Sequence, residues 1–358
     1  MYKHILVSGG AGFVGSNLAI AFKREFEGIS VTALDNLKRR GSELALRRLD
    51  TTGVQFHHGD IRNPEDIAEI GPFDLLIECS AEASVHSGYE SSPGYLLNTN
   101  LVGAIHCLEA ARQCGADVIF LSTSRVYPIA ELRNLPLEIT DERFDIPEKK
   151  SGLGWSIQGI TESFPLNGSR SLYGATKLAA EHLFTEYNEI FELRTIVNRC
   201  SVLAGPWQMG KVDQGFVALW AARHLYGGVL SYIGFGGNGH QVRDILHVAD
   251  LYELLKRQIK QIDVENQRTF NVGGGRSNSI SLAELTQLCK SCTGNDLKIA
   301  EDGRTRNADI PWYVTDNTEV STKFGWRPQY TIESLLDEVF SWLTDNRKAL
   351  EPILCPRR

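Results

Sequence analysis

The seven residues from Gly9 to Gly15 constrain the fold more than any other stretch of this sequence. They follow the short apolar run Ile5-Leu6-Val7, which is typical of a buried strand, and precede an apolar stretch of helical period from Asn17 to Phe26. Gly9, Gly12 and Gly15 have the spacing of a turn that lets the backbone approach a pyrophosphate closely. The helix behind such a turn offers free N–H groups and a favourable dipole to the phosphates. We therefore expect a dinucleotide site here.

Strand-like and helix-like runs alternate after this turn. We expect strands at 30–34, 54–58, 73–79 and 118–124, and a long helix from Asn98 to Cys114. Alternation at this spacing predicts an α/β fold with a doubly wound parallel sheet. Ligands bind such sheets at the carboxyl ends of the strands, so the polar and small residues at those ends are candidate site residues.

Two strand ends carry carboxylates. Asp35 lies about twenty residues past the glycines, where an acid bonds the ribose hydroxyls of adenosine. The same charge would repel a 2′-phosphate and therefore favours NAD over NADP, although the basic run Lys38-Arg39-Arg40 just beyond is an opposing feature. Asp60, after the third strand, is placed to bond the adenine amino group.

A phenol and an ammonium lie four residues apart at Tyr173 and Lys177. On a helix they share one face, one turn apart. A nearby cation favours the phenolate form of a tyrosine, so the pair can accept or donate a proton near neutral pH. By itself the spacing is a weak signal, because it occurs by chance on many helices as an exposed aromatic residue beside a solvated lysine. The strand ending in Ser122-Thr123-Ser124 brings hydroxyls to the same edge of the sheet.

Composition excludes several classes of protein. A chain of 358 residues, 42% hydrophobic and 23% charged, is an ordinary globular protein with room for two structural units. The net charge of −7 argues against a dedicated nucleic-acid binder, and no apolar run approaches the ~20 residues that span a bilayer. The seven scattered cysteines and the absence of a leader-like start predict no metal site and a reducing, cytoplasmic location.

Residues 129–170 lack clean periodicity and carry acids, prolines and glycines. A long insertion over the active face is often a lid or a substrate loop, and surface padding is the alternative.

Taken together, the glycine turn, Asp35, Ser122-Thr123-Ser124 and the Tyr173–Lys177 pair resemble the extended short-chain dehydrogenase/reductase family. Motifs at 242–248, 271–274 and 324–328 are similar to its nucleotide-sugar epimerase/dehydratase branch, and the match runs from about residue 4 to 345. Within that branch the chain resembles the CDP-paratose 2-epimerase (CDP-tyvelose 2-epimerase) group, through residues 35–41, 58–63, 122–127, 213–215 and 237–244.

The resemblance implies a Rossmann-type NAD-binding domain over residues 1–200, to which a segment near 240–265 returns. It implies a smaller C-terminal α/β substrate-binding domain over 201–239 and 266–345. The reaction would be transient oxidation: Tyr173 takes a hydroxyl proton while hydride passes to NAD, Lys177 bonds the nicotinamide ribose, and Thr123 positions the reacting oxygen. Hydride then returns to the opposite face and inverts the carbon, which is C2 in the CDP-paratose case. NAD should stay bound between turnovers.

The implied partners are a nucleotide-diphosphate sugar, with a CDP-sugar favoured, and further copies of the chain in a homodimer or homotetramer paired through the helices at 98–114 and 173–191. The implied cofactor-binding residues are Gly9, Gly12, Phe13, Val14, Gly15, Asp35, Asn36, Asp60, Ile61, Ser80, Ala81, Asn100, Ser122, Tyr173 and Lys177. The implied substrate-binding residues are Thr123, Ser124, Arg199, Ser201, Gln214, Arg243 and Arg306, with Arg243 and Arg306 holding the diphosphate.

The sequence departs from the family pattern in two places. The usual Val-Tyr-Gly-Pro loop is Val202-Leu203-Ala204-Gly205-Pro206, and the usual His-Leu-Ala segment is Glu78-Cys79-Ser80-Ala81-Glu82, where Glu82 either binds a sugar hydroxyl or points to solvent. Other family reactions stay open: 4-epimerisation, 4,6-dehydration and decarboxylation. A 4,6-dehydratase usually carries Asp-Glu where this chain has Ser124-Arg125. A non-catalytic NAD-binding regulatory protein is the alternative of another class, and the intact Thr123, Tyr173 and Lys177 argue against it.

Overall fold

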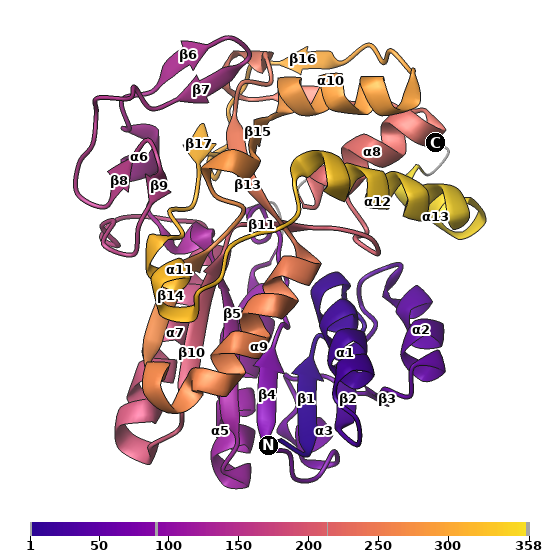
Figure 1. Ribbon diagram of the computed structural model, residues 1–358, viewed down its shortest axis with the longest axis vertical. Coiled ribbons are helices and arrows are strands. Elements are labelled where there is room, and N and C mark those ends of the chain that lie inside the picture. The colour runs from indigo at the N-terminus through magenta and orange to yellow at the C-terminus, as the bar shows by residue number, and fades with distance from the viewer. Residues whose placement is uncertain (1, 90–91, 213, 356–358) are drawn as a thin grey trace.

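The computed structural model describes residues 2–89, 92–212 and 214–355. Its centre is a seven-stranded parallel sheet in the order β14-β10-β5-β4-β1-β2-β3 (Figure 1). The strands are β1 (His4–Ser8), β2 (Ser30–Asp35), β3 (Gln55–His58), β4 (Leu75–Glu78), β5 (Asp117–Thr123), β10 (Thr195–Cys200) and β14 (Arg268–Val272). The predicted doubly wound parallel sheet is confirmed.

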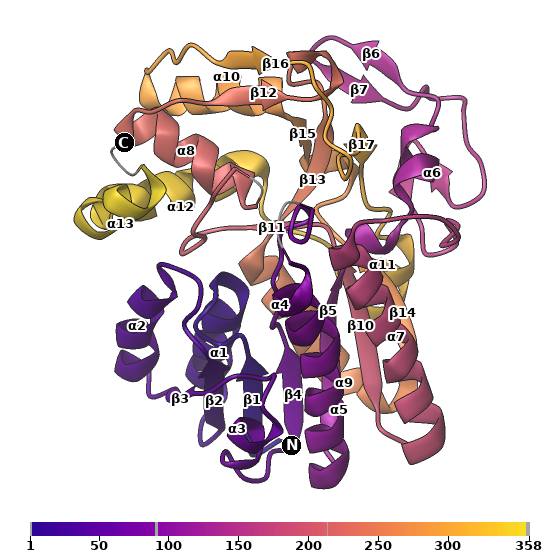
Figure 2. The ribbon, with the colours of Figure 1, turned by 180° about the vertical axis from the view of Figure 1, so that it is seen from behind.

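Helices cover both faces of this sheet. On the face toward the viewer in Figure 1 lie α1 (Phe13–Glu25), α9 (Val248–Glu265) and α11 (Thr318–Phe324), with α2 (Ala45–Thr51) beside α1. On the face toward the viewer in Figure 2 lie α3 (Pro64–Ala68), α4 (Gly94–Leu97), α5 (Gly103–Cys114) and α7 (Leu172–Phe191). Short helical turns are η1 (Ser42–Leu44), η2 (Asn98–Val102) and η3 (Ser124–Val126).

The strand sequences explain why both faces are covered. In β4, Leu75 and Ile77 pack with α1 and α9, whereas Leu76 between them packs with α5 and α7. Side chains of a strand alternate between its two faces, so a continuous apolar run needs an apolar layer on each side.

The second unit lies above the carboxyl ends of the strands in Figure 1. Its largest sheet joins β11 (Val202–Ala204), β13 (Val242–His247), β15 (Ser279–Ser281) and β17 (Trp312–Tyr313), and β12 (Ser231–Ile233) pairs with β16 (Ala300–Asp302). Its helical segments are α8 (Phe216–Tyr226), η4 (Phe235–Gly237), η5 (Arg276–Asn278), α10 (Leu282–Thr293), α12 (Ile332–Asp345) and α13 (Arg347–Leu354).

The structure differs from the predicted domain division in two places. β14 hydrogen-bonds to β10 in the large sheet, and α11 packs on that side of the molecule, although both were predicted in the second domain. β13, within the segment predicted to return to the first domain, belongs to the smaller sheet, and only α9 returns. The chain crosses between the units more often than a linear division allows. We propose that residues 248–272 and 318–326 belong with the first unit.

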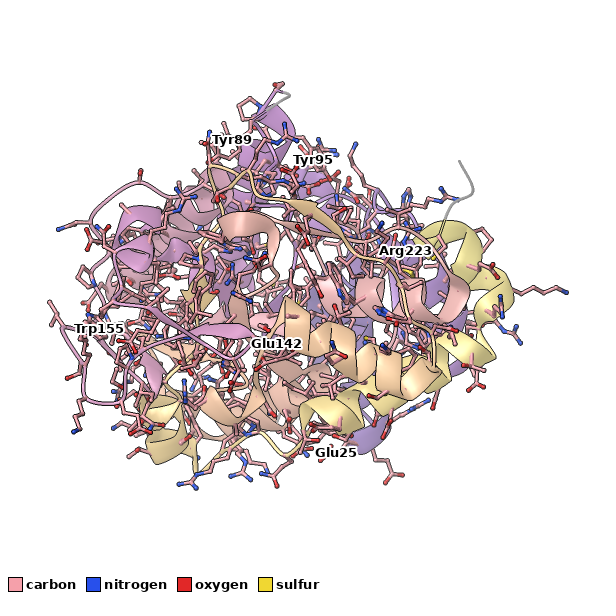
Figure 3. All side chains as sticks on the ribbon, turned by 90° about the horizontal axis from the view of Figure 1, so that it is seen from above. Glu25, Tyr89, Tyr95, Glu142, Trp155 and Arg223 are labelled. Atoms are coloured by element: carbon pink, nitrogen blue, oxygen red, sulfur yellow. The ribbon has the colours of Figure 1, made fainter. Side chains whose placement is uncertain are left out.

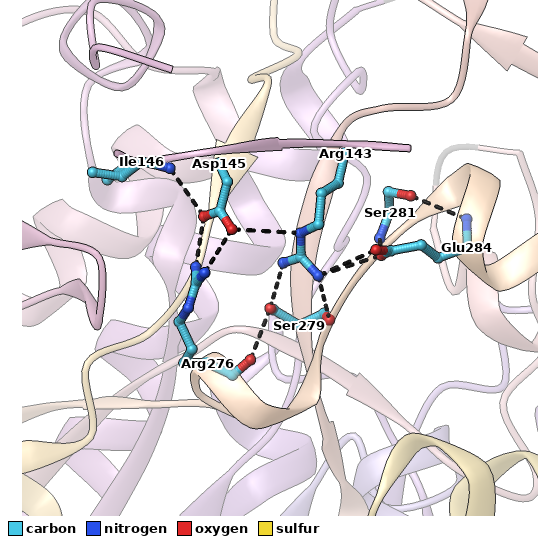
Figure 4. Close-up of polar contacts among 7 residues, drawn as sticks. All are labelled: Arg143, Asp145, Ile146, Arg276, Ser279, Ser281 and Glu284. Atoms are coloured by element: carbon cyan, nitrogen blue, oxygen red, sulfur yellow. Dashed lines mark hydrogen bonds and ion pairs between the residues drawn. The ribbon is translucent and has the colours of Figure 1, made fainter. Parts of the chain in front are cut away.

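The insertion at 129–170 folds onto the second unit. It contains α6 (Ile129–Arg133), a hairpin of β6 (Glu138–Thr140) and β7 (Arg143–Asp145), and a hairpin of β8 (Trp155–Ser156) and β9 (Gly159–Ile160). Figure 4 shows how β7 is held: Asp145 accepts two hydrogen bonds from Arg276, and Arg143 donates to Ser279 and Glu284. Seen from above, Trp155 of this insertion and Arg223 of α8 lie toward opposite sides of the molecule (Figure 3).

No helix in the described ranges combines the length and the apolar character that crossing a membrane requires.

The stacking of Phe184 on Phe120, with ring centroids 4.4 Å apart, seats α7 on β5, and both side chains are fully buried. Phe184→Ala should lower the free energy of unfolding by about 3–5 kcal/mol, because it leaves a cavity in a close-packed core. Val264→Ala, on α9 and 79% exposed, should change it by less than about 0.5 kcal/mol. Denaturant titrations of both variants measure the difference, and equal effects would contradict this description of the core.

Candidate active site

A cavity of about 890 Å³ lies where the carboxyl ends of the parallel strands meet the second unit. Gly9, Cys79, Thr123 and Cys200 line it from the ends of β1, β4, β5 and β10, or from just beyond them. Residues of α8, β12 and β13 line its other end. The cavity occupies the position at which doubly wound sheets bind ligands.

The glycine loop forms the floor of one end. Gly9 has φ +63°, which L side chains rarely adopt, and a Cβ on Gly15 would lie 2.2 Å from the carbonyl oxygen of Gly9. Gly12 caps α1 without a side-chain hydrogen bond, so the first N–H groups of the helix stay available. A pyrophosphate fits this cradle, because it supplies the acceptor that these groups lack.

Asp35 and Asp60 are not among the residues that line the cavity. Asp35 accepts hydrogen bonds from the amides of Ala11 (3.1 Å) and Leu37 (2.8 Å), which fixes its carboxylate against the glycine loop. Burial acts to raise the pKa of Asp60, but hydrogen bonds from Arg62 and Asn36 outweigh it and lower that pKa to about 2. Contacts of both acids with adenosine stay predictions.

The basic run beyond Asp35 is already engaged. Arg39 reaches across the cavity to the carbonyl of Met209 and to the side-chain oxygen of Gln214. Lys38 lies 4.5 Å from the ring centroid of Tyr95. Lys38 and Arg39 would therefore have to give up these contacts within the protein in order to bind the 2′-phosphate of NADP.

Tyr173 and Lys177 project into the cavity from the first turns of α7. Ser171 caps this helix by accepting the N–H of Gly174 at 3.2 Å. A Cβ on Gly174 would lie 2.1 Å from the carbonyl oxygen of Arg125, so a glycine is needed for α7 to approach the turn that follows Thr123. This approach brings the phenol, the ammonium and the threonine hydroxyl to one cavity, as the sequence predicts.

Arginines dominate the end of the cavity that belongs to the second unit. Arg243 donates to the carbonyls of Val242 (2.6 Å) and Ile310 (2.7 Å), and burial together with the guanidinium of Arg125 lowers its pKa to about 9. Burial acts to raise the pKa of Asp309, but His86, Arg125 and Arg243 outweigh it and lower that pKa. Because Arg306 also lines the cavity here, cations outnumber this acid.

The cavity brings most of the predicted site residues together. Those that line it are Gly9, Gly12, Phe13, Val14, Gly15, Ala81, Ser122, Thr123, Ser124, Tyr173, Lys177, Ser201, Gln214, Arg243 and Arg306. Their contacts with a cofactor or a substrate stay predictions. Asp213, which the narrower resemblance includes, lies outside the described residues.

Other predicted residues lie behind the lining. Ser80 accepts a hydrogen bond from Lys177 at 3.3 Å through its carbonyl. Asn100 accepts the N–H of Glu82 and donates to the carbonyl of Glu82, so it fixes the loop after β4. Ile61 is buried in the core, and its carbonyl lies 2.8 Å from Nδ1 of His106.

Arg199 does not line the cavity, which corrects its predicted role in substrate binding. It is 6% exposed, and its guanidinium donates at 2.8–3.2 Å to both carboxylate oxygens of Glu181, and at 3.2 Å to the hydroxyl of Tyr127. A polar residue near the end of a central strand can face inward as well as toward the ligand, and this arginine faces an internal acid.

No residue from 129 to 170 is among those lining the cavity in the conformation described, which favours surface padding over a lid or a substrate loop for this insertion. Glu82 does not line it either, and its carboxylate accepts a hydrogen bond from Ser87 at 3.4 Å. The sequence reasoning also missed His86 and Asp309, which lie in loops without a periodic pattern, and the role of Glu78, a carboxylate that ends a buried strand.

Comparisons with known proteins agree with this geometry. Residues 5–273 match the model of the NAD dependent epimerase/dehydratase family. CDP-paratose 2-epimerase of Salmonella typhi is 29% identical over 94% of this chain and 98% of that protein. The dTDP-glucose 4,6-dehydratase of Mycobacterium tuberculosis is 28% identical over 98% of this chain and 96% of that protein. The structure of Thermus thermophilus UDP-glucose 4-epimerase in complex with NAD superposes with a TM-score of 0.76 at 25% identity, over 96% of this chain and 99% of that one. The chain belongs to the NAD dependent epimerase/dehydratase family and is an enzyme whose cofactor is NAD.

Proposed function

We propose that this enzyme is a nucleotide-sugar epimerase that inverts one sugar carbon by transient oxidation to a ketone, with a CDP-sugar of the paratose type as substrate and C2 as the inverted carbon. The observation that supports this most is the shared cavity. It places Thr123, Tyr173 and Lys177 between the glycine loop and the arginine-rich end.

Each residue has one task in this proposal. The phenolate of Tyr173 takes the proton of the substrate hydroxyl, and it gives the proton back when the ketone is reduced. Bound NAD would supply the acceptor for the hydride of the same carbon and the source of the hydride that comes back. Thr123 orients the reacting oxygen, since its hydroxyl lines the cavity at the end of β5. The ammonium of Lys177 favours the phenolate and would bond the nicotinamide ribose.

The residues in and around the cavity fit both the cofactor NAD and the nucleotide-sugar substrate. The glycine loop and the uncapped start of α1 would hold the pyrophosphate of NAD, and Asp35 would hold its adenosine ribose. Arg243 and Arg306 would hold the substrate diphosphate, because planar guanidinium groups pair with phosphate through two hydrogen bonds. Inversion ends with the cofactor in its starting state, so NAD can remain bound between turnovers.

The residue at 125 favours epimerisation over 4,6-dehydration. Arg125 lines the cavity and donates to the carbonyl of Ala308 at 3.2 Å. A guanidinium is charged throughout the physiological pH range, so it cannot take the place of an acid that gives up and regains a proton. Among the relatives compared, the 2-epimerase supports a CDP-sugar, whereas the 4-epimerase and the dehydratase supply the competing reactions.

We also propose a homodimer, or a tetramer built from it, paired through α5 and α7. These helices lie side by side in Figure 2 and expose the apolar side chains of Ile190 (64%) and Phe191 (46%). Sedimentation of the purified protein measures the assembly, and a monomer at micromolar concentration would contradict it.

The substrate is tested by incubating the purified enzyme, without added NAD, with CDP-paratose and separately with UDP-glucose and dTDP-glucose. Nuclear magnetic resonance of the products distinguishes C2 inversion, C4 inversion and loss of water. We expect inversion at C2 of the CDP-sugar alone. A 4-keto-6-deoxy product, or inversion at C4, would replace the proposal with the corresponding family reaction.

Tyr173→Phe should reduce kcat by about 10³-fold, because it removes the group that exchanges the hydroxyl proton. The fold and the bound NAD should be unaffected, since the phenol makes no hydrogen bond to the described part of the chain that would hold α7 in place. Tyr187→Phe, in the same helix, removes a hydroxyl that bonds Glu109 and should lower stability by about 1 kcal/mol while leaving kcat unchanged. Full activity of the Tyr173 variant would overturn the mechanism.

Gly15→Ala should abolish retention of the cofactor. Its Cβ would lie 2.2 Å from the carbonyl of Gly9, so the loop must move away from the position that fits a pyrophosphate. The nucleotide released on denaturation should fall from about one NAD per chain to less than about a tenth of that. Gly303→Ala, whose Cβ has no neighbour closer than 3.6 Å, is the control and should retain NAD fully.

A further inference from the structure

We propose that Glu78 is a positioning residue: its carboxylate holds the ammonium of Lys177 at the back of the cavity and offsets the charge of that ammonium. This inference rests on the proposed function, because it concerns how the Tyr173–Lys177 pair is tuned. Lys177 lines the cavity, whereas Glu78 lies behind it and acts only through the lysine.

The geometry joins the two side chains in a dry environment. Oε2 of Glu78 lies 3.4 Å from Nζ of Lys177, and both residues are 1% exposed. The same ammonium donates to the carbonyl of Ser80 at 3.3 Å and lies 4.4 Å from the ring centroid of Phe120. Lys177 is therefore held from one side by β4 and β5, and its position does not depend on solvent.

The surroundings of Glu78 are those of a carboxylate. Oε1 accepts the N–H of Ser80 at 2.9 Å and the hydroxyl of Ser8 at 3.3 Å, while Oε2 accepts from Lys177. Burial raises the pKa of Glu78 above its ordinary value, and Lys177 with these two donors offsets only part of that effect. The three donors nevertheless favour the ionised form over what burial alone would allow.

Glu78 is the one anion within ion-pair distance of Lys177 among the described residues. The thiols of Cys79, Cys107 and Cys200 face it from β4, α5 and β10, and burial raises the pKa of each, that of Cys200 to about 12, so they stay neutral.

The guanidinium of Arg125 faces Tyr173 from the turn after β5, and the carboxylate of Asp309 faces that guanidinium. Two acids therefore offset the cations around the phenol: Asp309 acts at Arg125, and Glu78 acts at Lys177.

The consequence is a charge-balanced chain of Glu78, Lys177 and Tyr173. At rest, the carboxylate and the ammonium compensate one another, so the lysine stabilises the phenolate less than an unpaired ammonium would. Removing the carboxylate leaves the ammonium uncompensated. Coulomb's law with an effective dielectric constant of about 20 gives a shift of about one pH unit in phenolate formation, toward lower pH.

The test is a spectroscopic titration of the NAD-loaded protein. Near-ultraviolet absorbance of tyrosinate is followed against pH in the wild type and in Glu78→Gln, and the same curves from Tyr173→Phe backgrounds are subtracted to isolate one phenol. We expect the midpoint of the difference curve to move about one pH unit lower in Glu78→Gln, and the acidic limb of the pH–rate profile to move with it. An unchanged midpoint, or a move to higher pH, would overturn the proposal.

Two further variants separate positioning from mere structural support. Ser8→Ala removes a hydrogen bond to the same carboxylate but leaves its charge, so the protein should be less stable with an unchanged midpoint. Glu78→His removes the negative charge with a different shape and should move the midpoint in the same direction, which keeps the test available if Glu78→Gln does not fold. The titration needs no substrate: a wild type that inverts no nucleotide sugar would refute the proposed function without affecting this result.

Discussion

The close approach of α7 to the turn after β5 is the contact on which the site depends. Gly174 lies so near the carbonyl of Arg125 that a side chain would be placed 2.1 Å from it, and Phe184 stacks on Phe120 farther along the helix. These two contacts set both the depth and the rotation of α7. Because Tyr173 and Lys177 flank that glycine, the same contacts carry the phenol and the ammonium to the carboxyl ends of the strands. The chemistry of the site therefore depends on helix–sheet packing as much as on the residues that perform it.

Charge is distributed unevenly around this packed centre. The back wall is neutral in sum, since Glu78 compensates Lys177, whereas the end formed by the second unit carries more arginine than acid. Such an arrangement suits a reaction in which a proton and a hydride leave and return while a diphosphate stays bound. It also explains how a chain with a net charge of −7 can bind an anionic ligand, because the local field and not the total charge faces that ligand.

Sequence alone predicts the parts of this site that follow from local pattern. The glycine spacing, Asp35 at a strand end and the Tyr173–Lys177 interval each depend on a few neighbouring residues, and strand ends in a parallel sheet necessarily meet at one edge. Arg199 also lies near a strand end, but nothing in its neighbourhood shows that Glu181, from α7, would bind its guanidinium. The position of the insertion could not be predicted for a similar reason, because ion pairs with Arg276 and Glu284, which are distant in sequence, hold it on the second unit. Pairings between distant segments are not encoded in local periodicity.

The central claim is that one carbon is oxidised and reduced again within a single closed site. It is tested most directly with CDP-paratose carrying deuterium at C2, incubated with the purified enzyme in ordinary water without added cofactor. The account predicts that the inverted product retains the deuterium at C2 and that no reduced cofactor accumulates. Inversion with loss of the label to solvent would contradict it, because the hydrogen would then have left as an exchangeable proton. Accumulation of reduced cofactor with a keto sugar would contradict it as well, because the enzyme would then be a net dehydrogenase.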